Sequence, residues 1–375
     1  MVSAHAPGPN AYSMTAFPPL PTVDLDHVLD HTRELWASCA GRRLFLTGGT
    51  GFFGPWLVET FLHANDQLGL GAQMVVLTRD PDAAKVRFPH VARHAAVTFH
   101  RGDVRGFEPP PGEFDTVVHG AAESSQQDHI GDYGHMFDTI VDGTRQTLAL
   151  ARSSGARRYL LVSSGAVYGR QPPEVSHVAE DFPGGPDSFR ATSAYAEGKR
   201  AAEVLAAIEA DRGGLSVRVA RCFAFVGPHL PLDIHFAIGN FIRDAMHGGP
   251  IRVRGDGTAV RSYLYTADLA IWLWTLALSE TASGPYNVGS DEPLTIRQVA
   301  QAVADTCAPG VSVQVEGQSR EVGSTAPYVP CTRRATVELG LLRMVLLREA
   351  ILRTRDWYAP EPSTPLHSSP DTRSA

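Results

Sequence analysis

The sequence reads Thr47-Gly-Gly-Thr-Gly-Phe-Phe-Gly54 between an apolar segment, residues 43–47, and a segment with helical spacing that runs to about residue 63. Glycine allows a tight turn, and it lets backbone N–H groups approach a pyrophosphate at the N-terminus of the following helix. The spacing is Gly-x-x-Gly-x-x-Gly instead of Gly-x-Gly-x-x-Gly, but the order of strand, turn and helix is the one that dinucleotide binding requires. A tight turn without a ligand is the alternative. The residues of this turn that we predict to bind a dinucleotide are Gly48, Thr50, Gly51, Phe52, Phe53 and Gly54.

Short apolar segments continue to alternate with helical segments as far as about residue 220. We predict strands at residues 74–78, 97–100, 116–119, 159–163 and 216–220, and long helices at residues 134–153 and 195–210. This alternation is typical of a parallel sheet that is covered by helices on both faces. Together with the glycine turn, it predicts an α/β fold with a Rossmann-type doubly wound parallel sheet.

The pattern changes to shorter elements after about residue 225, which indicates a smaller C-terminal α/β region. We therefore expect four parts. They are an N-terminal extension at 1–41 with a helix at 23–37, a NAD(P)-binding domain at 42–225, a mainly substrate-binding region at 226–358, and a disordered tail rich in Pro and Ser at 359–375.

The composition excludes several classes of function. The 375 residues are 43% apolar and 19% charged, as expected for a globular protein. The net charge of −7, without a run of Lys or Arg, predicts no nucleic-acid partner. No apolar segment reaches the length of a membrane span, so we expect no membrane partner. The four cysteines match no zinc or disulfide spacing, which predicts reduced thiols, no metal site and a cytoplasmic location; they are Cys39, Cys222, Cys307 and Cys331.

The end of the second predicted strand bears on the choice of cofactor. Enzymes that use NAD often place a carboxylate there for the ribose 2′-hydroxyl, whereas this chain has Arg79 followed by Asp80-Pro81. Because a guanidinium can hold a 2′-phosphate with two hydrogen bonds, Arg79 favours NADP over NAD; a solvated Arg79 is the alternative. Asp80 and Pro81 are typical of a helix N-cap. Asp103, after the third strand, is a candidate acceptor for the adenine amino group or a residue that caps a turn.

A tyrosine and a lysine are spaced as one helical turn in Tyr195-Ala-Glu-Gly-Lys199, in a chain that has only two lysines. Residues i and i+4 share a face of a helix, so the Lys199 ammonium is expected beside the Tyr195 phenol. A neighbouring cation stabilises a phenolate and lowers the pKa of a tyrosine. Tyr195 is therefore a candidate general acid and base for a substrate hydroxyl.

Several motifs occur in one order between residues 42 and 358. They are the glycine turn, Arg101-Gly-Asp-Val104, His119-Gly-Ala-Ala-Glu-Ser124, Ser163-Ser-Gly-Ala-Val-Tyr-Gly169, Tyr195-x-x-x-Lys199, Arg261-Ser-Tyr-Leu-Tyr265 with Asp268, and Tyr286-Asn-Val-Gly289. In this combination the chain resembles the extended short-chain dehydrogenase/reductase family, in its nucleotide-sugar epimerase/dehydratase branch.

The resemblance implies roles for individual residues. Tyr195 would be the acid and base at a sugar hydroxyl, Lys199 would lower its pKa and bind the nicotinamide ribose, and Ser164 would bind the same substrate oxygen. Arg261 would pair with the diphosphate of a nucleotide sugar, and Arg221 would either pair with it too or form a surface ion pair. A homodimer through helices 134–153 and 195–210 is expected. Further implied contacts are Asp103, Val104, Ala121 and Ala122 to the cofactor, and Glu123 and Asn240 to the substrate.

Positions at which the chain departs from the family pattern bear on which reaction it catalyses. Dehydratases and decarboxylases of the family carry an acidic residue just before Val-Tyr-Gly, where this chain has Gly165 and Ala166. Elimination of water needs an acid and a base, which neither residue supplies. Ala224 also stands where the family often has an Asn that contacts the substrate.

We therefore predict an NAD(P)-dependent nucleotide-sugar epimerase that forms a transient ketone at C4. One alternative is an NADPH-dependent reductase of 4-keto sugar nucleotides, and another is a dehydratase with a relocated acid and base, for which Glu123 is a candidate. A protein that binds the cofactor without chemistry is a fourth hypothesis, which the complete set of Ser164, Tyr195 and Lys199 disfavours.

Overall fold

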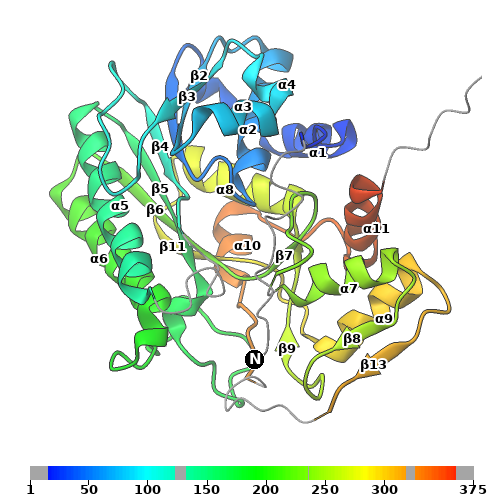
Figure 1. Ribbon diagram of the computed structural model, residues 1–375. Helices are drawn as coiled ribbons and strands as arrows, with labels where there is room; N and C mark the ends of the chain where they lie inside the picture. Colours follow the sequence, from blue (N-terminus) through cyan, green and yellow to red (C-terminus); the bar gives the residue numbers. More distant parts are fainter. Residues whose placement is uncertain (1–15, 123–131, 235, 318–325, 360–375) are drawn as a thin grey trace, which may run out of the picture.

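A seven-stranded parallel sheet forms the centre of the protein, with the strand order β11-β6-β5-β4-β1-β2-β3 (Figure 1). The computed structural model describes residues 16–122, 132–234, 236–317 and 326–359. The strands of the sheet are β1 (Arg43–Thr47), β2 (Gln73–Thr78), β3 (Val97–Arg101), β4 (Thr116–His119), β5 (Arg158–Ser164), β6 (Ser216–Cys222) and β11 (Gly284–Val288). The predicted parallel sheet is confirmed.

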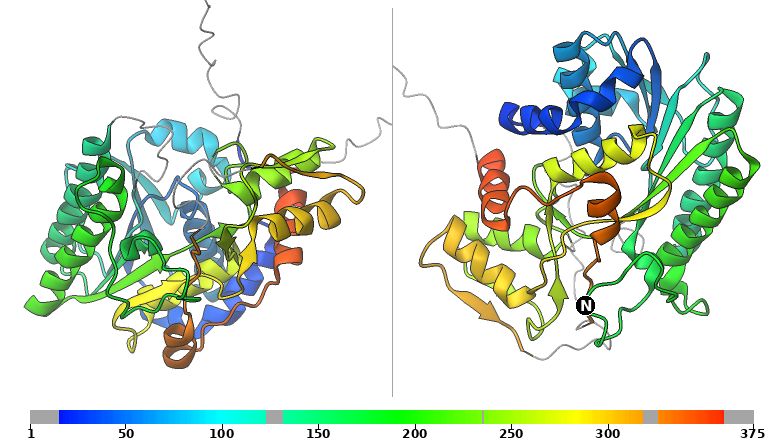
Figure 2. Two further views of the ribbon diagram at one scale, coloured as in Figure 1. Left: turned by 90° about the horizontal axis from the view of Figure 1, so that it is seen from below. Right: turned by 180° about the vertical axis from the view of Figure 1, so that it is seen from behind.

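Side chains of the strands alternate between two apolar layers, as the period of a β-strand requires. In β1, Leu44 and Leu46 belong to the core on one side of the sheet, whereas Phe45 belongs to the core on the other. Figures 1 and 2 show α5 (Tyr133–Ser153) and α6 (Ala194–Arg212) side by side on one face. The opposite face is covered by α2 (Gly54–Leu68) and α8 (Thr266–Leu278), which contact each other. The sheet is therefore buried on both faces, as expected for a doubly wound fold.

The predicted division at residue 225 does not separate the two parts of the chain completely. β11 and α8 come after that residue, yet β11 pairs with β6 at the edge of the sheet and α8 packs against β5 and β6. The segment 226–358 thus completes the first part and also builds the second. The reason is that a buried parallel strand needs a pairing partner and a covering helix, and the chain returns to supply both.

The smaller part lies beside the carboxyl ends of the strands and consists of short elements. Its helices α7 (Ala237–Met246) and α9 (Ile296–Cys307) pack against each other, and the parallel pair β8 (Ile251–Val253) and β13 (Val313–Val315) lies at its edge (Figure 1). The remaining elements are α3 (Pro81–Arg87), α4 (Pro89–Ala92), β7 (Phe225–Val226), β9 (Val260–Arg261), β10 (Leu264–Tyr265), β12 (Leu294–Thr295), α10 (Arg333–Leu339), α11 (Leu347–Tyr358) and the 3-10 turns Arg33–Cys39, Gly165–Tyr168 and Ala191–Ser193.

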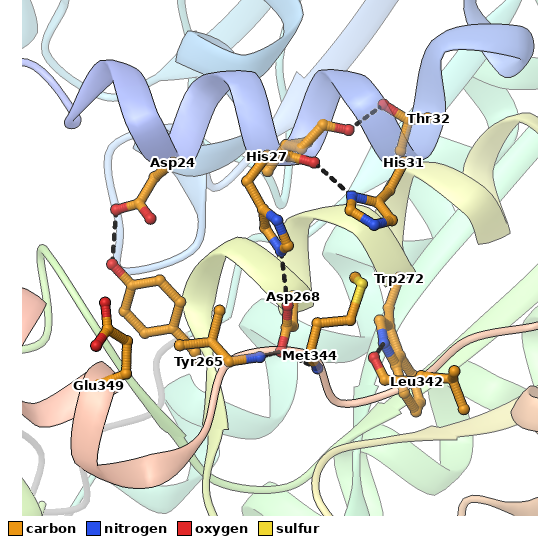
Figure 3. A network of polar contacts seen from close by, with 12 residues as sticks. Asp24, His27, His31, Thr32, Tyr265, Asp268, Trp272, Leu342, Met344 and Glu349 are labelled. Carbon is orange, nitrogen blue, oxygen red and sulfur yellow. Dashed lines mark hydrogen bonds and ion pairs between the residues drawn. The ribbon is translucent and has the colours of Figure 1, made fainter.

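The described part of the N-terminal extension, residues 16–41, packs against the rest of the fold. The predicted helix at 23–37 is shorter, since α1 (Thr22–Thr32) is followed by the 3-10 turn Arg33–Cys39. Figure 3 shows that side chains join α1 to β10 and α8: the Tyr265 hydroxyl donates to Asp24 at 2.6 Å, and His27 Nε2 lies 3.1 Å from Asp268. Asp268 also accepts the backbone N–H of Met344 at 2.9 Å. Residues 1–15 and 360–375, which include nearly all of the predicted tail, lie outside the described residues.

Within the described ranges, no helix is both long enough and apolar enough to cross a membrane, and no group of three or more metal-binding side chains occurs. All four cysteines are free thiols.

Candidate active site

A pocket of about 1690 Å³ lies between the carboxyl ends of the strands and the smaller part of the molecule. Ligands of open α/β sheets bind at this edge, because the loops after the strands diverge there. The predicted residues that line the pocket come from the glycine turn, from the ends of β2 to β5, from α6 and from the second part. They are Gly48, Thr50, Gly51, Phe52, Phe53, Gly54, Arg79, Asp103, Val104, Ala121, Ala122, Ser164, Tyr195, Lys199, Asn240 and Arg261.

The glycine turn has the geometry of a cradle. Gly48 has a φ of +79°, and a Cβ there would lie 2.6 Å from the carbonyl carbon of Gly120. A Cβ on Gly54 would overlap the backbone of Gly49, so the turn packs tightly against the start of α2. A Cβ on Gly51 would meet only the carbonyl oxygen of Gly48, at 3.5 Å, and this exposed position faces the pocket. The turn therefore fits a pyrophosphate at the N-terminus of α2.

Two carboxylates near the far edge of the sheet have local roles. Asp80 caps α3 by accepting the N–H groups of Asp82 and Ala83, each at 3.1 Å, as predicted. Asp103 accepts from the backbone and the guanidinium of Arg105, which lowers the pKa of its carboxyl group. Asp103 lines the pocket, but its carboxyl group already binds Arg105. This contact favours the second of the two predicted roles, a residue that caps a turn, over an acceptor for the adenine amino group.

Ser164 and Tyr195 are brought together by the end of β5 and the first turn of α6. Ser164 is buried, and its Oγ accepts the N–H of Ala166 at 3.1 Å. Burial raises the pKa of Tyr195, and interaction with the Ser164 hydroxyl lowers it in part. The expected lowering of the Tyr195 pKa is therefore wrong for this structure, because burial dominates.

Lys199 lies in the pocket wall but directs its ammonium at the sheet. Its Nζ donates to the carbonyl oxygen of Val162 at 2.7 Å, and burial lowers its pKa to about 8. Cys222 is a close neighbour, and burial raises the pKa of its thiol to about 12, opposed by Lys199. The lysine thus sits one helical turn after Tyr195, as the spacing predicts, and its charge acts on the backbone of β5.

Arg261 and Arg221, which were predicted to share one role, lie in different environments. Arg261 lines the pocket and donates to the carbonyl oxygens of Val260 and Ala326, both at 2.8 Å, while burial lowers its pKa. The predicted role of Arg221 at the diphosphate is wrong. Side chains alternate along β6, so Arg221 faces away from the pocket, where it pairs with Glu203 at 2.7 Å.

Asn240 lines the pocket from α7 and is held by local contacts. Its Nδ2 donates to the carbonyl oxygen of Ile234 at 2.8 Å, and its Oδ1 accepts from Arg243 at 3.1 Å. Glu123, predicted to contact the substrate, lies outside the described residues.

The pocket also contains residues that sequence reasoning missed. Tyr263 and Tyr328 lie on its wall, and Arg252 and Arg254 line it from β8 and the residue that follows β8. Ile251 and Val253 are fully buried, so the alternation of β8 signals that Arg252 and Arg254 share the opposite face. Tyr263 stands in the motif that contains Arg261. No sequence pattern points to Tyr328, which arrives through a bridge to Arg261.

A glycine cradle at the start of a helix, with Ser, Tyr and Lys at the same edge of a parallel sheet, defines a dinucleotide-binding α/β enzyme. The model of the NAD dependent epimerase/dehydratase family matches residues 44–289, and the chain belongs to this family.

Relatives and solved structures agree with this assignment. The chain is 30% identical to UDP-glucuronic acid decarboxylase 1 of Arabidopsis thaliana over 83% of this chain and 68% of that protein. It is similar to the structure of a dTDP-glucose 4,6-dehydratase from Streptomyces venezuelae with NAD bound, with 28% identity, a TM-score of 0.70, and coverage of 84% and 96% of the two chains. It is also similar to a UDP-glucose 4-epimerase of Thermus thermophilus in complex with NAD, with 25% identity, a TM-score of 0.68, and coverage of 84% and 98%.

Proposed function

We propose that the protein is a nucleotide-sugar epimerase that acts through a transient ketone at C4 of the sugar. The observation that carries the proposal is the chemistry around Tyr195. Ser164 and Lys199 share the pocket with it, and the two residues after Ser164 are Gly165 and Ala166, which carry no carboxylate. Oxidation of an alcohol needs a base to take the hydroxyl proton, which is the phenolate form of Tyr195, whereas elimination of water needs a further acid.

Each residue of the pocket has its own role in the proposed reaction. Tyr195 takes the proton of the sugar hydroxyl and returns it, and Ser164 holds the same oxygen by a hydrogen bond. Arg261 attracts the diphosphate, since a half-buried guanidinium is a strong partner for phosphate oxygens. The glycine turn and α2 hold the pyrophosphate of the cofactor. The chemistry that a bound nicotinamide supplies is reversible hydride transfer, and hydride return to the opposite face of the ketone inverts the carbon.

The position of the pocket carboxylates supports an epimerase over a dehydratase. Within the described part of the chain the lining carboxylates are Asp80, Asp103, Asp244 and Glu316. The first two follow β2 and β3, and the other two lie on α7 and after β13, so they flank the ends of the pocket instead of its centre. Ala166 offers no acid at the end of β5. Elimination would have to use a group from outside these residues, such as Glu123.

A second candidate is a decarboxylase of a nucleotide uronic acid. The observation in its favour is the 30% identity with UDP-glucuronic acid decarboxylases. Once C4 is a ketone, the carboxylate attached to C5 leaves as carbon dioxide and its bonding electron pair passes to the enolate. A proton then adds at C5, and the hydride held by the cofactor returns to C4. Gly165 and Ala166 count against this candidate, because decarboxylases of the family resemble the dehydratases in carrying an acidic residue there.

The identity of the product separates these candidates. Purified protein is incubated with NAD and, in turn, UDP-glucose, UDP-glucuronic acid and dTDP-glucose, and the products are resolved by chromatography, mass and NMR. We expect an isomer of unchanged mass and no net reduction of NAD. Loss of carbon dioxide would establish the decarboxylase instead, loss of water the dehydratase, and stoichiometric oxidation of NADPH with a keto sugar the reductase.

The cofactor is NAD or NADP, and Arg79 at the pocket wall favours NADP. Titration with each nucleotide, in the natural protein and in Arg79→Ala, tests this preference. If Arg79 binds a 2′-phosphate, the substitution weakens binding of NADP and leaves that of NAD nearly unchanged.

We also infer a homodimer through α5 and α6. Val204 and Ile208 lie one turn apart on α6 and expose 58% and 46% of their surface, so together they offer an apolar surface for a second copy of the helix. Sedimentation of the natural protein should give a dimer, and Val204→Glu with Ile208→Glu should give a monomer.

A further inference from the structure

Glu203 joins α6 to the end of β5. It lies one helical turn after Lys199, on the part of α6 that packs against β5 and β6 (Figure 1). Its carboxylate accepts the hydroxyl of Ser163 at 2.6 Å. A hydrogen bond of this kind, from a hydroxyl to a charged acceptor, is roughly twice as strong as one between neutral groups. Because Ser163 is buried and directly precedes Ser164, the helix is held to the sheet next to the proposed catalytic serine.

The same carboxylate is linked to the chain on the other side of Ser164. Arg221 of β6 binds both oxygens of Glu203, with Nη2 2.7 Å from Oε2 and Nε 3.1 Å from Oε1. The Nη1 of Arg221 donates to the hydroxyl of Tyr168 at 2.9 Å, and Tyr168 ends the 3-10 turn that follows β5. The chain is therefore held on both sides of Ser164, before it by Glu203 and after it by Arg221.

These contacts lie behind the pocket wall. Side chains alternate along β5, so Ser163 points to the face that α6 covers, whereas Ser164 points away from it. Ser163 and Ser164 both line the pocket, but Glu203 is not among the described residues that do. The Ser163 hydroxyl is already bound to the carboxylate. An effect of Glu203 on the reaction must therefore pass through the position of its neighbours instead of through a contact with the substrate.

We propose that Glu203 is a positioning residue, which holds Ser164 in place through its hydrogen bond with Ser163. The proposal rests on the function proposed above, because it concerns the same proton transfer. Tyr195 lies about two turns before Glu203 on α6, so this bond also sets the distance between the Ser164 and Tyr195 hydroxyls. Catalytic groups must be held to within about 0.5 Å, and a displacement of about 1 Å can lower a rate roughly a hundredfold.

The test is Ser163→Ala, which removes the hydroxyl and leaves Glu203 paired with Arg221. For the nucleotide sugar that the natural protein converts, kcat should fall about tenfold, while KM should stay within a factor of about two. The matched control is Tyr159→Phe, which removes a buried hydrogen bond of 2.8 Å to Thr147 near the start of the same strand. Both variants should lower the urea midpoint by a similar amount, but Tyr159→Phe should leave kcat unchanged.

A double-mutant cycle identifies the route through Glu203. Glu203→Gln keeps the size of the side chain but replaces the charged acceptor by a neutral one. Ser163→Ala should therefore lower kcat by only about threefold or less in this background. A fall in kcat that is as large in both backgrounds, or an unchanged kcat of Ser163→Ala in the natural background, would overturn the proposal.

The position of Ser164 can also be measured without turnover. In crystals of the natural protein and of Ser163→Ala grown alike, the Ser164 Oγ of the variant should lie about 0.5 Å or more from its natural place, or occupy two positions. Failure of the epimerase proposal is distinguishable, because another product changes the reaction followed but not the comparison of the two proteins. A Ser164 that keeps its natural place in Ser163→Ala contradicts the role of Glu203 whatever the product is.

Discussion

Replacement of Lys199, which we propose to be part of the active site, should make the protein more stable at neutral pH. Burial lowers the pKa of Lys199 from its ordinary 10.5 to about 8. One pKa unit corresponds to about 1.4 kcal/mol, so the charged form is held in the folded state at a penalty of roughly 3 kcal/mol. Lys199→Met removes this penalty and also removes the hydrogen bond to Val162, which contributes about 1 kcal/mol. The variant should therefore gain about 2 kcal/mol at pH 7.

The difference in unfolding free energy between Lys199→Met and the natural protein should also change with pH in a defined direction. Between pH 8 and 10.5 the folded protein has released the Lys199 proton while the unfolded chain still binds it. Stability of the natural protein must then rise with pH relative to the variant, because the unfolded state binds more protons. The advantage of Lys199→Met should be full below pH 8 and absent near pH 10.5.

The assay is unfolding in urea, followed by tryptophan fluorescence at pH 7, 8, 9 and 10 without cofactor. Lys85→Met is the matched control, since Lys85 is the only other lysine and its exposed side chain pairs with Asp82 at 3.3 Å. That variant should change stability by less than about 0.5 kcal/mol at every pH. An advantage of Lys199→Met that is equal at pH 7 and pH 10, or a loss of stability at pH 7, would refute the reasoning.

Four further substitutions test other parts of the account. Arg261→Ala should weaken UDP binding about tenfold or more in calorimetry. Arg221→Ala should leave UDP binding unchanged but lower the free energy of unfolding by about 3 kcal/mol, because it leaves Glu203 without its partner. Weaker UDP binding by Arg221→Ala and unchanged binding by Arg261→Ala would show that Arg221 contacts the diphosphate. Gly54→Ala should abolish NAD binding measured by fluorescence, because its Cβ overlaps the turn; binding at natural affinity would contradict the cradle. Tyr265→Phe should lower the free energy of unfolding by about 1 to 2 kcal/mol, since it removes a partner of the buried Asp24 carboxylate; an unchanged urea midpoint would show that α1 does not depend on this bond.

The parts of the fold that local patterns determine could be predicted from the sequence. Strands β1 and β4 have the predicted bounds, because short apolar runs between turns are a local signal. The position of Lys199 one turn after Tyr195 on α6 also follows from helical spacing alone, whereas the predicted contact of its ammonium with the phenol does not, since the ammonium donates to Val162. The prediction that the glycine turn binds a cofactor needed one more observation, namely the place of the turn between a strand and a helix.

Contacts between distant segments were not predictable in the same way. Arg221 was misplaced because its partner Glu203 lies on the preceding helix, and no pattern in the sequence marks that pair. Tyr328 was missed because a bridge across 67 positions, from residue 261 to residue 328, brings it to the site. The pKa of Tyr195 was predicted from its neighbour Lys199, but burial, which depends on the complete fold, decides its direction.

The fate of the hydrogen at C4 tests the central claim most directly. A nucleotide sugar that carries deuterium at C4 is converted in ordinary water by the natural protein and by Tyr195→Phe, and the product is analysed by mass and NMR. We predict an isomer that retains the deuterium at C4, formed at least about a hundredfold more slowly by Tyr195→Phe. Solvent hydrogen at the inverted carbon, a product lighter by water or carbon dioxide, or full activity of Tyr195→Phe would contradict the account.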